Sequence, residues 1–223
     1  MAPIDVYIER YGIDKLLSSD LTGLLRLQSR EPGELIIRSG SPARELLFLV
    51  RGRAKVYRTL ENGHCLLSAF YNPLEILGEV ELFTSDRYSL SAQALSETIC
   101  LVLPSEAVRK AADRNSRLLE YLCGRMGRKL TDRNAAEAIN LRYPVEARLA
   151  SYLLSATDRQ GLLIGSDKLW EIADFLGASH RQLSRAVSSL REAGVLAPER
   201  GRIRVLDKGR LEALAPDRYD QGL

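Results

Sequence analysis

The sequence contains few residues of the kinds that usually hold metals. Its two histidines, His64 and His180, lie in different halves of the chain, so their number excludes a two-histidine metal site within one domain. The three cysteines, Cys65, Cys100 and Cys123, are far apart and show none of the close spacings typical of zinc or iron–sulfur ligands. Their apolar neighbourhoods predict small buried side chains, and a redox-sensing thiol is the alternative.

Long apolar runs are also missing. The run at residues 46–50 is five residues long, far short of the ~20 residues that a membrane span needs, and we expect no signal segment at the N-terminus. We therefore expect a cytoplasmic protein without a membrane partner. No Ser/His/Asp arrangement or pair of catalytic carboxylates is visible, and a cupin-type enzyme would need clustered histidine and carboxylate ligands. The sequence predicts a protein that is not an enzyme and has no metal site.

A helix-turn-helix pattern occupies residues 167–192. Ser179 is predicted as an N-cap, and Gln182 completes a capping box three residues later. An apolar stripe then recurs at helical spacing, and its members are Leu183, Ala186, Val187 and Leu190. Residues 167–176 form a second amphipathic segment, and Gly177 lies where a residue without a Cβ can turn the chain. Two short helices joined by a three-residue turn predict a DNA-binding motif.

Positive charge is concentrated in and after this motif. The outer face of the second helix carries Arg181, Ser184, Arg185 and Ser188, and arginine can donate two hydrogen bonds to guanine in a major groove. Residues 195–206 predict a two-stranded wing that turns at residues 198–201. Between residues 177 and 210 eight Arg or Lys face three acids, a surplus of five, whereas the whole chain carries only +3. This surplus indicates a local phosphate-binding surface.

Residues 31–104 change to a period of two, which predicts strands. The alternating pairs are Leu35/Ile37, Leu46/Phe48/Val50, Ala54/Val56, Leu67/Ala69 and Leu101/Leu103. Glycines punctuate them, and Asn62-Gly63 is a strong type I′ hairpin signal. Many short strands with glycine turns predict a sandwich or a jelly roll, and a roll can hold one small ligand. Residues 1–31 are predicted as short helices that pack against this domain.

A long amphipathic helix is predicted over residues 116–141. Its apolar positions are Leu118, Leu119, Leu122, Cys123, Met126, Leu130, Ala135, Ala138 and Ile139. The helix would span about 37 Å at ~1.5 Å per residue, too long merely to cap a roll, and self-pairing as a coiled coil would cover its stripe. The alternative is that the stripe packs on its own roll. We expect a homodimer, because helix-turn-helix proteins usually read two half-sites.

Pro144 marks the boundary of the last domain. Residues before proline avoid the helical region, so Tyr143 is predicted as a hinge, and residues 145–156 as the next helix. The predicted fold class is α+β in three parts. A double-stranded β-helix (jelly-roll) domain with short flanking helices covers residues 1–115, a dimerisation helix covers 116–142, and a winged helix-turn-helix domain covers 143–223.

This order of elements resembles the Crp-Fnr superfamily of bacterial transcription regulators over nearly the whole chain. The matching residues are Pro32-Gly-Glu34, Leu47-Phe-Leu-Val-Arg-Gly52-Arg-Ala-Lys-Val56, Ile76-Leu-Gly78-Glu79, Leu82-Phe83, and Gly177-Ala-Ser179 with Arg185. Three segments, Arg53-Ala-Lys-Val-Tyr57, Asn62-Gly63 and Gly78-Glu-Val-Glu-Leu82, are similar to the YeiL-type branch. The resemblance implies a cyclic-nucleotide-binding-like roll, with double-stranded DNA and RNA polymerase as partners. It also makes loop 158–165 the candidate polymerase contact.

The predicted DNA-binding residues lie on the second helix of the motif and on the wing. They are Ser179, His180, Arg181, Gln182, Ser184, Arg185 and Arg202. By resemblance, Arg185 matches the family's base-reading arginine, Ser179 lies at a phosphate or cap, and Arg202 touches the DNA backbone. The family's frequent glutamate is Arg181 here, so we expect an operator that differs from that of the catabolite activator.

The predicted effector pocket comprises Gly78, Glu79, Leu90 and Ser91. In the family's cyclic-nucleotide binders, the glutamate of a Gly-Glu pair binds the ribose hydroxyl, and the arginine of a later Arg-Ser-Ala motif neutralises the phosphate. Gly78 and Glu79 match the pair, but Leu90 stands where the arginine should be, and Arg87 lies three residues too early. Losing a charge-assisted pair costs about 1.5–3 kcal/mol, so we expect an effector other than cyclic AMP.

Other control signals stay open at this point. Glu79 is either a ligand contact or a structural acceptor for backbone amides. No cysteine precedes Cys65, so the family's iron–sulfur branch does not fit, whereas haem and thiol sensing remain alternatives.

We therefore predict a homodimeric transcription regulator without a certain cofactor. It would read a palindromic operator through residues 180–192 and be controlled by a signal at the roll. The alternative is a small-molecule sensor that acts through protein contacts without binding DNA. Steep weakening of DNA binding with salt would separate the two functions.

Overall fold

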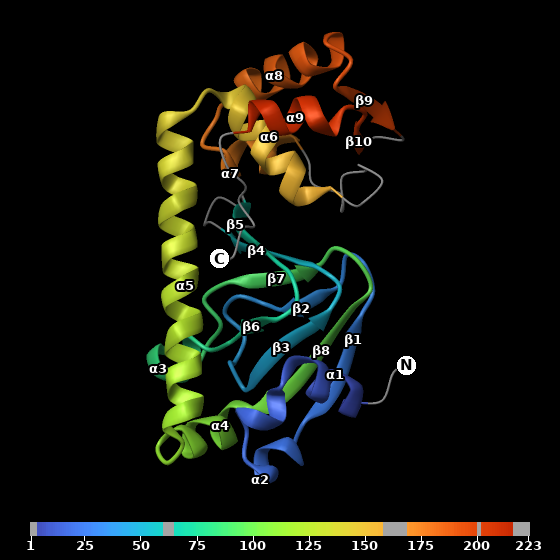
Figure 1. Cartoon of the computed structure of the whole chain (residues 1–223). Coiled ribbons are helices and arrows are strands. Elements are labelled where there is room, and N and C mark those ends of the chain that lie inside the picture. The colour runs from blue at the N-terminus through green and yellow to red at the C-terminus, as the bar shows by residue number, and fades with distance from the viewer. Residues whose placement is uncertain (1–3, 60–64, 158–168, 200–201, 216–223) are drawn as a thin grey trace. The chain divides into compact units, whose positions relative to one another are not determined.

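The computed structural model describes residues 4–59, 65–157, 169–199 and 202–215, without the side chains of residues 65, 135, 136, 138, 139 and 202. These residues divide into two compact units (Figure 1). The first contains residues 1–59 and 71–130, and the second contains residues 60–70 and 131–223. The expected hairpin at 62–63, the loop 158–165 and the tip of the wing lie outside the described residues.

Two four-stranded antiparallel sheets form the predicted roll. One has the order β1-β8-β3-β6 and the other has the order β2-β7-β4-β5. The strands of the first sheet are β1 (Arg26–Arg30), β3 (Glu45–Arg51), β6 (Glu75–Leu77) and β8 (Thr98–Pro104). Those of the second are β2 (Leu35–Ile37), β4 (Ala54–Thr59), β5 (Cys65–Tyr71) and β7 (Ser91–Ala94). The jelly-roll prediction is confirmed.

The two central strands of the first sheet are buried on both faces, which explains their nearly unbroken apolar sequence. Leu47 and Leu49 of β3 point into the interior of the roll, where they join a cluster with Val56. Leu46 and Phe48 point to the other face and join a second cluster. The alternation that predicted these strands therefore divides β3 between two cores.

Short helices cover the outer face of this sheet. They are α1 (Ile4–Tyr11), the 3-10 helix η1 (Ile13–Lys15), α2 (Ser19–Thr22) and α4 (Ser105–Ala112). The prediction that residues 1–31 are helical is wrong for 26–30, because β1 pairs with β8 over its whole length, from Arg26 opposite Val102 to Arg30 opposite Thr98. The hydrogen bonds to the partner strand determine the extended conformation of this segment, because Arg26–Arg30 itself has little alternation of apolar residues.

The predicted long helix is α5 (Ser116–Arg142), and its apolar positions divide between two faces. Leu118 and Leu122 are fully buried in the outer core of the roll. These two residues therefore pack on the roll of their own chain, which was the alternative to self-pairing. Leu119 is 38% exposed, Leu130 is 62% exposed, and Cys123 is also exposed. Residues 119, 123 and 130 recur at coiled-coil spacing. The stripe is therefore two adjacent stripes, of which one remains open.

The second unit contains the predicted winged helix-turn-helix. Its elements are α6 (Val145–Ala156), α7 (Leu169–Phe175), α8 (His180–Glu192), β9 (Leu196–Glu199), β10 (Arg202–Val205) and α9 (Lys208–Leu214). The helix α6 begins at Val145, directly after Pro144, as expected. In its core, the rings of Phe70, Tyr152 and Phe175 lie 5.5–6.0 Å apart. The helix α9 was not predicted, and Asp207 begins it by accepting from the Arg210 amide.

No helix in the described ranges is long and apolar enough to cross a membrane. The same residues contain no group of three or more His, Cys, Asp or Glu side chains arranged to hold a metal ion.

Candidate nucleic-acid interface and effector site

The recognition helix α8 begins with the predicted capping box. The Ser179 hydroxyl accepts from the Gln182 amide at 3.2 Å, and the Gln182 side chain accepts from the Ser179 amide at 2.9 Å. The four residues of the predicted apolar stripe, Leu183, Ala186, Val187 and Leu190, are the buried ones. Ser179 and Gln182 therefore fix the start of the helix. Polar residues occupy the face opposite the buried apolar stripe.

The outer face of α8 presents exposed arginines. His180, Arg181 and Arg185 are exposed, and Ser184 is half-buried. Among the described residues no hydrogen bond or ion pair is found for the guanidinium groups of Arg181 and Arg185. Both can therefore donate to an external acceptor without breaking an internal bond. Arg185 is one turn from Arg181, so the two guanidiniums lie on the same side of the helix.

The turn between α7 and α8 is held by backbone hydrogen bonds and by one buried arginine. Gly177 has φ +59°, and the amides of Gly177 and Ala178 donate to Asp174 and Ala173, the pattern of a glycine-ended helix. Arg148 of α6 is buried and donates through Nη1 to the Leu176 carbonyl. It was not predicted, although a charged residue on an apolar helix signals such a contact.

The strand β9 extends further along the wing than the sequence predicted. Pro198 lies within β9 opposite Ile203 rather than in the turn, where an edge strand tolerates its missing amide hydrogen. The Nε and Nη2 of Arg204 on β10 both donate to the carboxylate of Glu199 on β9, and the Nη2 hydrogen bond is 2.9 Å long. Arg202 is the first residue of β10, and its side chain lies outside the described residues.

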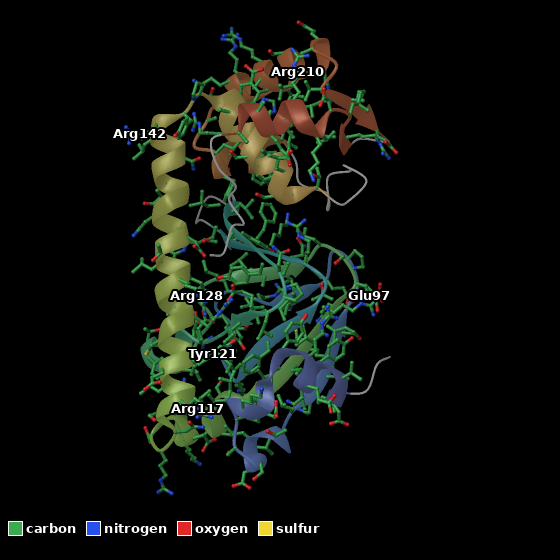
Figure 2. All side chains as sticks on the ribbon, in the orientation of Figure 1. Glu97, Arg117, Tyr121, Arg128, Arg142 and Arg210 are labelled. Atoms are coloured by element: carbon green, nitrogen blue, oxygen red, sulfur yellow. The ribbon has the colours of Figure 1, made fainter. Side chains whose placement is uncertain are left out.

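A further arginine supports the end of the recognition helix. Arg210 of α9, labelled in Figure 2, donates to the Ala193 carbonyl at 3.0 Å. Ala193 is the C-cap of α8, where a cation is favoured by the helix dipole. Sequence reasoning missed this role because it left the tail after the wing without a helix.

The effector site begins at a glycine that no other residue can replace without movement. Gly78 follows β6 with φ +90°. A Cβ there would lie 2.7 Å from the Glu45 carbonyl oxygen and 3.2 Å from the Tyr88 ring. Tyr88 donates its hydroxyl to the same carbonyl at 2.7 Å. This close approach fixes the direction in which the chain enters Glu79.

Glu79 is buried and paired with a lysine of the long helix. Its side chain is 3% exposed, and its Oε1 lies 2.5 Å from the Nζ of Lys129. Lys129 also donates to the Ile76 carbonyl at 2.5 Å and lies 4.4 Å from the centre of the Tyr71 ring. Burial disfavours the charged ammonium, but Tyr71, Glu79 and Glu75 outweigh it, and the pKa of Lys129 is raised. Lys129 therefore stays protonated.

The segment that should neutralise a phosphate carries no cation. Leu90 packs against the inner core of the roll, and the buried Ser91 accepts from the Ser39 amide at 3.0 Å. The buried carboxylate of Glu81 accepts from the amide and hydroxyl of Ser89, at 3.0 and 2.6 Å. Arg87 is exposed and donates to the Gly40 carbonyl. Leu90 therefore brings no positive charge to this segment, and the guanidinium of Arg87 is already bonded to a backbone carbonyl.

Comparisons with known proteins match both parts of the chain. The cyclic nucleotide-binding domain family matches residues 27–115, and the Crp-like helix-turn-helix domain family matches residues 147–214. The regulatory protein YeiL of Escherichia coli O157:H7 is 28% identical over 182 residues, covering 82% of each chain. The transcriptional activator protein anr of Pseudomonas aeruginosa is 25% identical, covering 82% of this chain and 78% of its own.

Solved structures agree with this result. TTHB099, a transcriptional regulator of the CRP family from Thermus thermophilus, has a TM-score of 0.71 at 25% identity, covering 86% of this chain and 98% of that one. A crp/fnr-family protein from Eubacterium rectale shares the fold, with a TM-score of 0.78 at 18% identity, covering 94% and 98%.

A roll of the cyclic-nucleotide-binding type and a winged helix-turn-helix in one chain define a DNA-binding transcription regulator. The chain belongs to the Crp-Fnr superfamily, whose helix-turn-helix regulators bind DNA and act as dimers.

Proposed function

We propose that α8 reads a palindromic operator and that Arg185 is its base-reading residue. The observation that carries the proposal is the exposed guanidinium of Arg185, which has no partner within the described ranges. It lies on a helix that is fixed at both ends, by the Ser179 box and by Arg210. Arginine in this position can donate two hydrogen bonds to guanine. His180, Arg181 and Ser184 would contact neighbouring bases or phosphates, and Arg202 of the wing would contact the DNA backbone.

The open stripe of α5 supports the assignment of the dimer contact to this helix. Leu119, Cys123 and Leu130 leave an apolar face exposed in a single chain. Pairing of this face with that of a second copy would bury it as a parallel coiled coil. A symmetric dimer presents two copies of α8, as a palindromic operator requires.

The proposal also covers the domain boundaries, the cellular location, the protein partner and the control signal. We take residues 1–115 as the effector domain, 116–142 as the dimerisation helix and 143–223 as the DNA-binding domain. We also propose a cytoplasmic, non-enzymatic protein of the YeiL type that contacts RNA polymerase. Its control does not use cyclic AMP, and the support for this is the leucine at position 90 together with the buried carboxylate of Glu81.

Selection of binding sites from random DNA tests the role of Arg185. Arg185→Ala should cost about 1–3 kcal/mol of binding free energy and relax the preference at one base pair of each half-site. Arg202→Ala should instead weaken binding to all sequences equally. Arg114→Ala, which removes an exposed charge after α4, is the control and should change neither. The proposal is wrong if Arg185→Ala selects the same sequences as the wild type.

A further inference from the structure

Four charged side chains form a balanced cluster between β6 and α5. Glu75 lies on β6 and Glu79 just after it, whereas Arg125 and Lys129 lie one turn apart on α5. Arg125 lies 2.5 Å from Glu75, and Lys129 lies 2.5 Å from Glu79 and 3.5 Å from Glu75. None of the four side chains is more than 18% exposed. Buried charges of this kind are stable only while each keeps its partner.

The cluster continues the face of α5 that packs on the roll. Leu118 and Leu122 of that face are buried in the outer core, and Arg125 and Lys129 follow at helical spacing of three and four residues. Arg125 donates to the Leu74 carbonyl at 2.8 Å and Lys129 to the Ile76 carbonyl at 2.5 Å. The first turns of α5 therefore pack on the roll through apolar contacts, and the next two turns bind it through ion pairs and hydrogen bonds.

The same cluster occupies the carboxylate that the family resemblance assigned to a nucleotide. A ribose hydroxyl would have to compete with the ammonium of Lys129 for the carboxylate of Glu79. Leu90 supplies no charge for a cyclic phosphate, and within the described residues both cations of the cluster are already paired with carboxylates. An anionic ligand would thus separate buried ion pairs and gain no new cation.

We propose that Lys129 is a built-in substitute for a nucleotide effector, so that its bond to Glu79 fixes α5 on the roll and makes DNA binding independent of cyclic nucleotides. The inference rests on the proposed DNA-reading function. The open stripe at residues 119, 123 and 130 lies beside the face that carries Arg125 and Lys129. Holding one face against the roll therefore sets the direction of the other, and with it the dimer that presents two copies of α8.

The first test uses the full-length wild-type protein and needs no operator. Calorimetric titration with millimolar cyclic AMP or cyclic GMP should show no heat of binding, and the melting temperature should not move. Binding of either nucleotide in the micromolar range would overturn the proposal. This outcome does not depend on the DNA sequence that the protein recognises.

The second test measures operator affinity, with the operator taken from the binding-site selection. The wild type should bind equally, within twofold, with and without cyclic nucleotide. Lys129→Met keeps the apolar stem but removes the charge, and it should weaken operator binding at least tenfold. The control Lys110→Met removes a lysine that is exposed on α4 and pairs only at the surface with Glu106, and it should bind like the wild type. Unchanged binding by Lys129→Met would refute the inference.

A double variant separates a specific pair from general damage. Glu79→Gln removes the partner charge, so Glu79→Gln combined with Lys129→Met should regain part of the melting temperature that Lys129→Met loses. Simple addition of the two losses would contradict a Glu79–Lys129 pair. If the wild type binds no DNA at all, the DNA-reading proposal fails, whereas this thermal comparison and the nucleotide titration still decide the role of Lys129.

Discussion

Replacing Arg148 by methionine should loosen the helix-turn-helix without touching its DNA-reading face. Methionine keeps an apolar stem of similar reach, so the change mainly removes the guanidinium that donates to the Leu176 carbonyl. A hydrogen bond to a charged group contributes about 1.5–3 kcal/mol. Part of this is offset, because the Nε of Arg148 is buried and has no partner among the described residues. We therefore expect a loss of about 1–2.5 kcal/mol in the free energy of unfolding of the second unit.

The chain carries a suitable probe for this experiment. Its single tryptophan, Trp170, lies on α7, the helix whose end Arg148 caps. Guanidinium unfolding followed by Trp170 fluorescence should show an earlier midpoint for Arg148→Met than for the wild type. Arg142→Met, at the exposed end of α5 (Figure 2), is the matched control and should shift the midpoint little. Equal midpoints for Arg148→Met and the wild type would refute the capping role.

Two further predictions concern the roll and the thiols. Gly78→Ala places a Cβ 2.7 Å from the Glu45 carbonyl oxygen. It should lower the melting temperature more than Gly33→Ala, because Gly33 has a similar φ of +91° but open space around it. Equal losses in the two variants would show that backbone strain alone matters. Burial raises the pKa of Cys100 to about 12, so iodoacetamide at pH 8 should modify Cys100 only after unfolding, as mass spectrometry can check. Modification of Cys100 at the same rate in the native and the unfolded protein would contradict its burial.

The parts of the fold that sequence predicted well are those decided by neighbouring residues. The Ser179–Gln182 capping box and the buried stripe of α8 depend on spacings of three and four along one helix. The start of α6 depends on Pro144, which acts on the residue before it. Such signals are complete within a few residues, and the structure confirms each of them.

The elements that sequence reasoning missed are decided by partners far along the chain. β1 is a strand because β8, about 70 residues later, pairs with it. The roles of Arg148 and Arg210 depend on helix ends at Leu176 and Ala193 that only the folded unit brings near. The division of the α5 stripe into a roll-facing and an open face also needs the roll, because both sets of residues have the same period.

The leucine at position 90 and the lysine at position 129 have one explanation in terms of charge. A site that binds an anionic ligand needs a cation beside the carboxylate that takes the sugar. Once Leu90 stands in place of that cation, the buried carboxylate of Glu79 has no ribose hydroxyl to donate a hydrogen bond to it, and an unpaired buried charge is strongly unfavourable. Ser89 donates to Glu81, and Lys129 binds Glu79. Restoring an arginine with Leu90→Arg should therefore not restore nucleotide binding by itself, because Lys129 would still occupy Glu79.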